Sequence, residues 1–241
     1  MNGVELAARY AFPPNRHGYC GTPSFRKALA ADLAGAGDTA VLKEELKLFR
    51  VHYAYLDLIA RENGKDPFDL EVVRAFWIGN SLLERVRHES LREFIVDDLF
   101  EEKDRARAES LAEDLPEGAL PHHSFNPLYV NFVSGRVRRS IRSFDSCCIT
   151  FGTLSSVAGK TAMMDRSCVC WDRGFALRSR KDTVYLESHG VRLAGALKAG
   201  DAVSVHWGMV VQKLCPGDLS ALERYTKLNM DRLNLKRGRY V

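Results

Sequence analysis

The feature that most constrains the fold is a change in hydrophobic period near residue 120. Before this point, apolar residues recur at three- and four-residue spacings, as in residues 41–60, which is typical of amphipathic helices. After Pro121, short β-type segments are separated by Gly and Asp, which favours a barrel or sandwich. The 241 residues are enough for two ordinary domains. The sequence therefore predicts an α+β protein, with an all-helical domain over 1–120 and a small β domain with a C-terminal helix over 121–241.

The first half is predicted to be a set of helices preceded by an ordered loop. The loop covers residues 12–23, which are rich in turn formers. Its Cys20 is expected to pack as part of a cap over the helices, whereas a role for His17 stays open. The predicted helices cover residues 24–33, residues 41–60 up to a stop at Asn63-Gly64, a segment capped by Asp69, and residues 89–115.

The second half is predicted to be a run of short strands that ends in a helix. An Ala-Gly-Lys turn at 158–160 is expected to join two strands into a hairpin. The predicted strands cover residues 129–133, 149–157, 161–164, 169–171, 183–187, 202–207 and 209–214, and the final helix covers residues 218–233.

Hydropathy and cysteine usage point to a cytoplasmic protein. No apolar run approaches the roughly 18 residues that cross a bilayer, and the N-terminus lacks the layout of a secretory signal. We therefore expect no membrane association. In a reducing cytoplasm, clustered thiols are more often metal-binding, catalytic or buried than bridged. The six cysteines are Cys20, Cys147, Cys148, Cys168, Cys170 and Cys215.

The two halves of the chain differ in charge. Residues 1–120 hold 16 Lys and Arg against 22 Asp and Glu, a net charge of −6, and residues 121–241 hold 19 against 9, a net charge of +10. The basic groups are scattered apart from short clusters such as Arg136, Arg138 and Arg139. A docking surface for an acidic protein, or a solvated face, is favoured over nucleic acid, which we consider an unlikely partner.

Two motifs in the second half occur together. The first runs from Cys147 through Gly152 to a Gly-containing turn at 158–160, and the second is Gly200-Asp-Ala-Val-Ser-Val-His206-Trp-Gly. An apolar strand and a helix follow the second motif in the sequence. In this order the two motifs resemble the HypC and HupF family of hydrogenase assembly chaperones. The resemblance covers roughly residues 146–230. The whole chain also resembles a prokaryotic family that combines a helical part bearing Pro-Pro-Asn, a His-His-Ser-Phe junction and this barrel, and that brings no known activity.

The first resemblance implies an OB-like barrel with a metal-handling role. In HypC-like proteins the cysteine and histidine help to hold an iron centre that carries cyanide and carbon monoxide during nickel-iron hydrogenase maturation. Carried over to this sequence, those positions are Cys147 and His206. The implied partners are a HypD-like scaffold protein and the hydrogenase large subunit. The chemistry is consistent, because a thiolate is a soft, strong donor to iron and a neutral imidazole can ligate beside it.

Two further residues are candidates for the same metal site. Cys148 adjoins Cys147, and the sequence leaves open which of the two thiols is functional. His122 and His123 are adjacent on an extended segment, so at most one of them is expected to join any single site. We take His123 as the candidate, and helix capping or solvent exposure of both histidines is an equally good interpretation. Cys168 and Cys170 share one strand face but are more typical of core residues.

Three functions remain open at this point. The leading hypothesis is an assembly or carrier protein that binds an iron complex or the protein that carries it, with Cys147 as a ligand and His206 as a second ligand or an orienting group. The second is a metal-free OB-like module that docks on a protein or nucleic acid through Arg136, Arg138, Arg139 and Arg142. The third is an enzyme that uses a Cys-His pair on an unknown substrate. The absence of phosphate-loop, nucleophile-elbow and zinc-protease motifs makes an enzyme the less favoured class.

Overall fold

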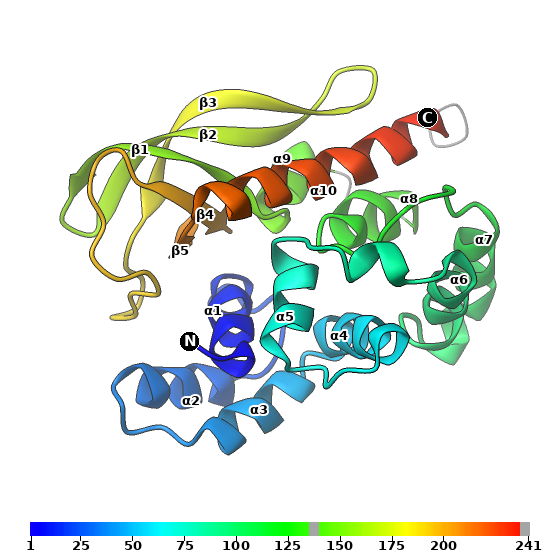
Figure 1. The fold of residues 1–241 in the computed structure, drawn as a ribbon, viewed down its shortest axis with the longest axis horizontal. Coiled ribbons are helices and arrows are strands. Elements are labelled where there is room, and N and C mark those ends of the chain that lie inside the picture. The colour runs from blue at the N-terminus through cyan, green and yellow to red at the C-terminus, as the bar shows by residue number, and fades with distance from the viewer. Residues whose placement is uncertain (135–139, 237–241) are drawn as a thin grey trace.

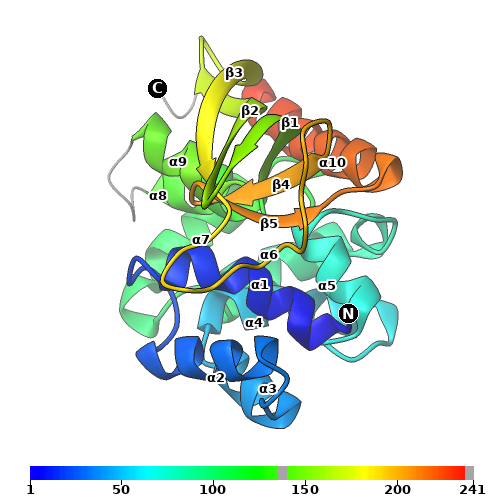
Figure 2. The same ribbon diagram turned by 90° about the vertical axis from the view of Figure 1, so that its left-hand side faces the viewer.

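The computed structural model describes residues 1–134 and 140–236 and confirms the predicted α+β class. Helices form the first part of the chain, a closed five-stranded barrel follows, and a long helix ends the described region (Figure 1). Figure 2 shows α1 (Gly3–Asn15) beneath strands β4 and β5 of the barrel. Among the described residues, no helix has both the length and the apolar character to span a membrane.

The helical part consists of short helices rather than a few long ones. The predicted helix over 41–60 is two helices, because the chain breaks at Leu48 and Phe49, and the predicted helix over 89–115 is also interrupted. Phe49 leaves the helical conformation and packs edge-on against Phe25, with their ring centroids 4.7 Å apart. The remaining helical elements before residue 120 are α2 (Pro23–Leu33), α3 (Thr39–Lys47), α4 (Arg50–Asn63), α5 (Leu70–Trp77), η1 (Leu83–Arg85), α6 (His88–Asp97), η2 (Glu102–Asp104) and α7 (Arg105–Glu113).

The predicted loop over 12–23 is wrong in its first part, because α1 continues through Pro13 and Pro14 to Asn15. Pro is disfavoured inside a helix because it lacks an N–H and because its ring crowds the preceding turn. Here both prolines are buried, and burial of the apolar face of α1 outweighs the local penalty. The helix ends at Arg16, and only residues 16–22 form a loop.

The barrel closes in the order β1-β2-β3-β5-β4, with β1 also paired to β4. The OB-like barrel predicted from the sequence is therefore present, and β2 joins two segments that were predicted as separate strands. The 158–160 turn links β1 to β2 as expected. The strands are β1 (Thr150–Ala158), β2 (Thr161–Trp171), β3 (Phe175–Tyr185), β4 (Ala202–His206) and β5 (Met209–Lys213), and α10 (Pro216–Leu235) follows.

The strand predicted at 129–133 is wrong, because this segment is helical. It belongs to η3 (Asn126–Asn131), a π-helix, and to α8 (Phe132–Ser134). Pro127 lies in the first turn of η3, where a missing N–H costs little, and Tyr129 donates its hydroxyl to the Leu111 carbonyl at 2.5 Å. A short apolar run cannot be assigned to strand or helix from its period.

The apolar core has two parts. One lies inside the barrel and includes Leu154, Met164 and Val203, while the other continues from the helices to the barrel and α10 without interruption. Helices also continue past Pro121 as far as α9 (Ile141–Cys147). The boundary between 1–120 and 121–241 stays a prediction. Arg136, Arg138 and Arg139, which the docking hypothesis used, lie outside the described residues.

Candidate metal centre

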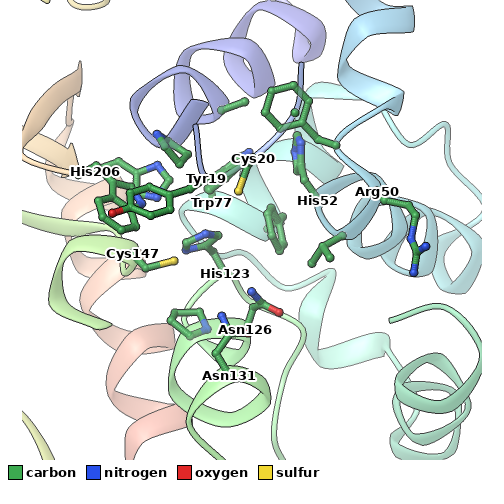
Figure 3. A pocket seen from close by; sticks show the side chains of 18 of the residues that line it. Tyr19, Cys20, Arg50, His52, Trp77, His123, Asn126, Asn131, Cys147 and His206 are labelled. Carbon is green, nitrogen blue, oxygen red and sulfur yellow. The ribbon is translucent and has the colours of Figure 1, made fainter. Parts of the chain in front are cut away.

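A cavity of about 480 Å³ lies where the helical part meets the barrel (Figure 3). Its walls are mainly aromatic and aliphatic, and its polar side chains include three histidines and Cys147. Cavities of 300–1,000 Å³ with a few placed polar groups are typical of ligand sites. The histidines are His52, His123 and His206.

His206 is oriented by the double proline of α1. In a regular α-helix the Tyr10 carbonyl would accept from the N–H four residues later, but that residue is Pro14, which has no N–H. His206 Nδ1 lies 2.8 Å from this carbonyl oxygen instead. A carbonyl can only accept, so His206 carries its proton on Nδ1. The Nε2 atom is then left with its lone pair free, and among the described residues it has no hydrogen-bond partner.

Cys147 and His206 are brought together by a contact between a helix end and a turn. The turn is Trp207-Gly208, which joins β4 to β5 with positive φ angles of 48° and 72°, as in a type I′ hairpin. The backbone N–H of Trp207 donates to the Ser146 carbonyl at 2.9 Å. Cys147 follows Ser146 and is the last residue of α9, so it lies on a helix and not on a strand beside β4.

The end of α9 is anchored from the barrel side. Asp145 accepts a hydrogen bond from the Val169 backbone N–H at 2.7 Å and forms a buried ion pair with Arg166 at 2.8 Å. Asp145 and Arg166 therefore tie α9 to β2. This connection places Cys147, two residues further along, at the mouth of the barrel.

His123 comes from the segment between the helices and the barrel. Its backbone N–H donates to the Phe76 carbonyl at 2.8 Å, and its ring stacks on Trp77 with centroids 4.5 Å apart. The ring meets His206 edge-on at 5.2 Å. The side chain is 6% exposed, and Nδ1 has no hydrogen-bond partner among the described residues.

His123, Cys147 and His206 form one cluster, in which the potential ligand atoms all lie within 4.8 Å of one another. Figure 3 shows the three side chains gathered at one end of the cavity. Metal bonds to sulfur and nitrogen are about 2.0–2.3 Å long, so the ligand atoms of one tetrahedral ion lie roughly 3.3–3.6 Å apart, and donors within 4.8 Å of one another need to close in by only about 1 Å to share an ion. We call this set the His2Cys cluster.

Other residues considered from the sequence lie outside this cluster. Cys148 is fully buried in the apolar core. His122 points elsewhere, and its Nδ1 is 2.9 Å from the Ser124 hydroxyl. Cys168 and Cys170 lie on β2, and His17 lies beside Trp207, with ring centroids 5.9 Å apart.

Burial keeps the cluster uncharged in the absence of a cation. It lowers the pKa of His206 to about 4, a shift that the Tyr10 and Cys147 carbonyls partly oppose, and it lowers the pKa of His123 well below its usual value. Burial also raises the pKa of the Cys147 thiol to about 12. A protonated thiol beside weakly basic imidazoles is a poor nucleophile, which disfavours a Cys-His enzyme.

The donor set fits a bound transition metal ion. Each imidazole has a buried ring nitrogen without a partner in the part of the chain that the structure describes, which is costly unless something binds it. Thiolate and imidazole are ligands that iron, zinc, cobalt and copper accept, and the hard ions magnesium and calcium prefer oxygen. The hydrogen bond from His206 to the Tyr10 carbonyl is the type of outer contact that orients metal-binding histidines.

Sequence reasoning missed several residues that line the cavity. His52 lies in the predicted helix over 41–60 and was not a site candidate, but it is 8% exposed and neither ring nitrogen has a partner among the described residues. Trp77 was not singled out, although its ring contacts both cluster histidines. Cys20 was expected to be part of a cap, and it lines the cavity near its mouth. A histidine on the apolar face of a helix was the available signal for His52.

Comparison with known proteins gives one match. A model for a family of unknown function, DUF6390, matches residues 1–239, so the chain belongs to this family. Neither the curated proteins nor the solved structures contain a match. The resemblance to HypC and HupF therefore rests on the two motifs alone.

Proposed function

We propose that this protein binds a transition metal ion through His123, Cys147 and His206 and serves as an assembly or carrier protein for a metal centre. The observation that carries the proposal is the His2Cys cluster, whose donors converge within 4.8 Å and include two buried nitrogens without partners. Because these donors come from three separate parts of the chain, local sequence alone does not explain why they converge.

The number of ligands favours a site with open positions. Structural zinc sites are usually closed by four protein ligands, whereas sites that bind a further molecule leave at least one position free. Here three protein donors adjoin a cavity of about 480 Å³. A metal held in this way is accessible to a small ligand and can be passed to a protein that supplies stronger or more numerous donors.

The HypC-like form of this proposal names iron as the cargo. In this form the protein binds an iron complex with cyanide and carbon monoxide, and it works with a HypD-like scaffold protein and a nickel-iron hydrogenase large subunit. Support comes from the two sequence motifs and from the proximity of Cys147 and His206, the two positions that the resemblance selects. His123 adds a third donor that the motifs do not include.

The test is anaerobic purification of the full chain from its native host, followed by metal analysis and infrared spectroscopy. We expect about one metal ion per chain in the wild type, because a single cluster is proposed. Cys147→Ala should lose the metal, and His206→Ala should retain a reduced amount. Cys148→Ala is the matched control, since Cys148 is adjacent but lies in the core, and it should keep the wild-type content.

The outcomes separate the hypotheses. Iron with infrared bands of cyanide and carbon monoxide would support the HypC-like form, and another metal without such bands would keep the cluster but reject that form. Equal loss in Cys147→Ala and Cys148→Ala would contradict the assignment of the ligand. A hydrogenase-assembly partner that co-purifies with metal-free protein would favour the docking module.

A further inference from the structure

We propose that the cavity beside the His2Cys cluster binds a small monoanion, which coordinates the metal at one end and accepts a hydrogen bond from His52 at the other. This inference rests on the proposed metal site. It adds a second binding partner to that site and a function for residues of the helical part.

His52 is the first observation. It lies on α4, lines the cavity and is packed between aromatic rings, with centroids 5.5 Å from Phe76 and 5.0 Å from Trp77. Neither of its ring nitrogens has a hydrogen-bond partner among the described residues. A neutral imidazole has one donor and one acceptor, and leaving both unpaired in an apolar wall is unfavourable. A ligand in the cavity would satisfy at least one of them.

Trp77 connects His52 to the metal cluster. Its ring centroid lies 5.0 Å from that of His52, 4.5 Å from that of His123 and 5.6 Å from that of His206. Figure 3 shows His52 separated from Cys147 by the cavity. A ligand that starts at the metal and follows the Trp77 wall therefore approaches His52. The Trp77 Nε1 is a donor without a partner among the described residues, and it offers a second contact.

The charges around the cavity select an anion. Among the described residues that line it, none is Asp or Glu, and the one charged side chain is Arg50. A divalent ion bound by one thiolate and two neutral imidazoles retains one positive charge. Burying a net charge among apolar side chains is costly, and a monoanion removes this charge. Hydrogen-bond donors on the wall then favour an anion with acceptor atoms at both ends.

The test uses cobalt(II) as the metal and azide as the anion, with the purified full chain made metal-free and reloaded anaerobically. Cobalt bound to a thiolate has a charge-transfer absorption that reports metal binding without any assay of function. Azide should shift the ligand-field bands of the wild type in a saturable manner while the thiolate band persists. A hydrogen bond to a charged group is worth roughly a factor of ten or more in affinity, so His52→Phe should weaken azide binding about tenfold.

Controls separate this inference from the metal site. His52→Phe should bind cobalt as the wild type does, and His52→Gln, which keeps a donor, should recover part of the azide affinity. His88→Phe makes the same change at an exposed position of α6 and should leave both titrations unchanged. Cobalt binding without an azide response, or equal azide affinity in the wild type and His52→Phe, would overturn the anion site alone. Failure to bind cobalt would overturn the proposed metal site as well.

Discussion

Replacing Pro14 by Ala tests whether the double proline of α1 orients His206. The variant restores a backbone N–H four residues after Tyr10, where a regular helix would use it to occupy the Tyr10 carbonyl. That carbonyl now accepts from His206 Nδ1 at 2.8 Å. We expect the restored N–H to compete for the carbonyl, so that His206 no longer holds its proton on Nδ1 and its Nε2 no longer faces the cluster as a fixed donor.

The effect on stability is expected to be small because two contributions oppose each other. Pro inside a helix is about 3 kcal/mol less favourable than Ala, which favours the variant. Pro14 is buried, however, and removing about two CH₂ groups costs roughly 1.6 kcal/mol of burial, while a more flexible unfolded chain costs a further 0.4–1 kcal/mol or so. The free energy of unfolding should therefore change by no more than about 1 kcal/mol.

Metal affinity should respond much more strongly. Loss of an outer contact to a metal-binding histidine typically lowers affinity by about 10- to 100-fold. Pro13→Ala is the matched control, because its restored N–H lies four residues after Arg9 and leaves the Tyr10 carbonyl to His206. Two assays check this: cobalt titration for affinity, and nitrogen-15 NMR of the metal-free protein for the His206 tautomer.

Equal cobalt affinity in the wild type, Pro13→Ala and Pro14→Ala would refute this reasoning. A carbonyl oxygen has two lone pairs, and such a result would mean that it accepts both hydrogen bonds without disturbing His206. Loss of affinity in both variants, together with a lower unfolding free energy, would instead assign the prolines a purely structural role.

Two other predictions concern stability. Asp145→Asn removes one of the two carboxylates that pair with buried Arg166, the other being Asp182 at 2.7 Å, and urea unfolding should show a loss of about 2–3 kcal/mol, against no measurable change in Asp172→Asn, whose carboxylate is 55% exposed. Hydrogen bonds from Arg87 lower the pKa of Glu62 to about 2, below its value in the unfolded chain. This pair therefore stabilises the fold above about pH 5, and the stabilisation is lost as the pH falls toward 2. Because Arg87 is exposed, solvent screens the pair, and we expect its contribution to be small. Glu62→Gln should therefore lose less stability to urea between pH 6 and pH 3 than the wild type does, and an equal loss in the two proteins would contradict this assignment.

The elements that the sequence predicted well are those whose pattern is set by local rules. Alternating strands with Gly turns gave the barrel, and the paired motifs singled out Cys147 and His206, whose ligand atoms the fold does bring together. The motifs predict that these ligand atoms are close because Cys147 and His206 lie at the same end of neighbouring elements. The position of Cys147 at the end of a helix, by contrast, depends on the Asp145 contact to β2, which no local pattern reveals.

The failures occurred where burial overrides local preference. Pro13 and Pro14 are usually breakers, yet the packed face of α1 keeps them helical, and the segment at 129–133 is an apolar run too short to show its period. His52 looked ordinary because a histidine on the apolar face of a helix does not by itself distinguish a cavity wall from a packed core. The unpaired nitrogens of His52 can be recognised only once α4 and α5 are packed around that cavity.

The sequence left open what the helical part contributes, and the contacts of the cluster answer this. The Cys147 and His206 motifs belong to the end of α9 and the barrel, but the proton of His206 is placed by a carbonyl of α1. His123 is held by a carbonyl at the end of α5 and by the Trp77 ring. A barrel without these helices would therefore keep two of the three donors and lose the contact that orients one of them. The helical part thus completes the His2Cys cluster and, through His52 and Trp77, forms the wall of the cavity beside it.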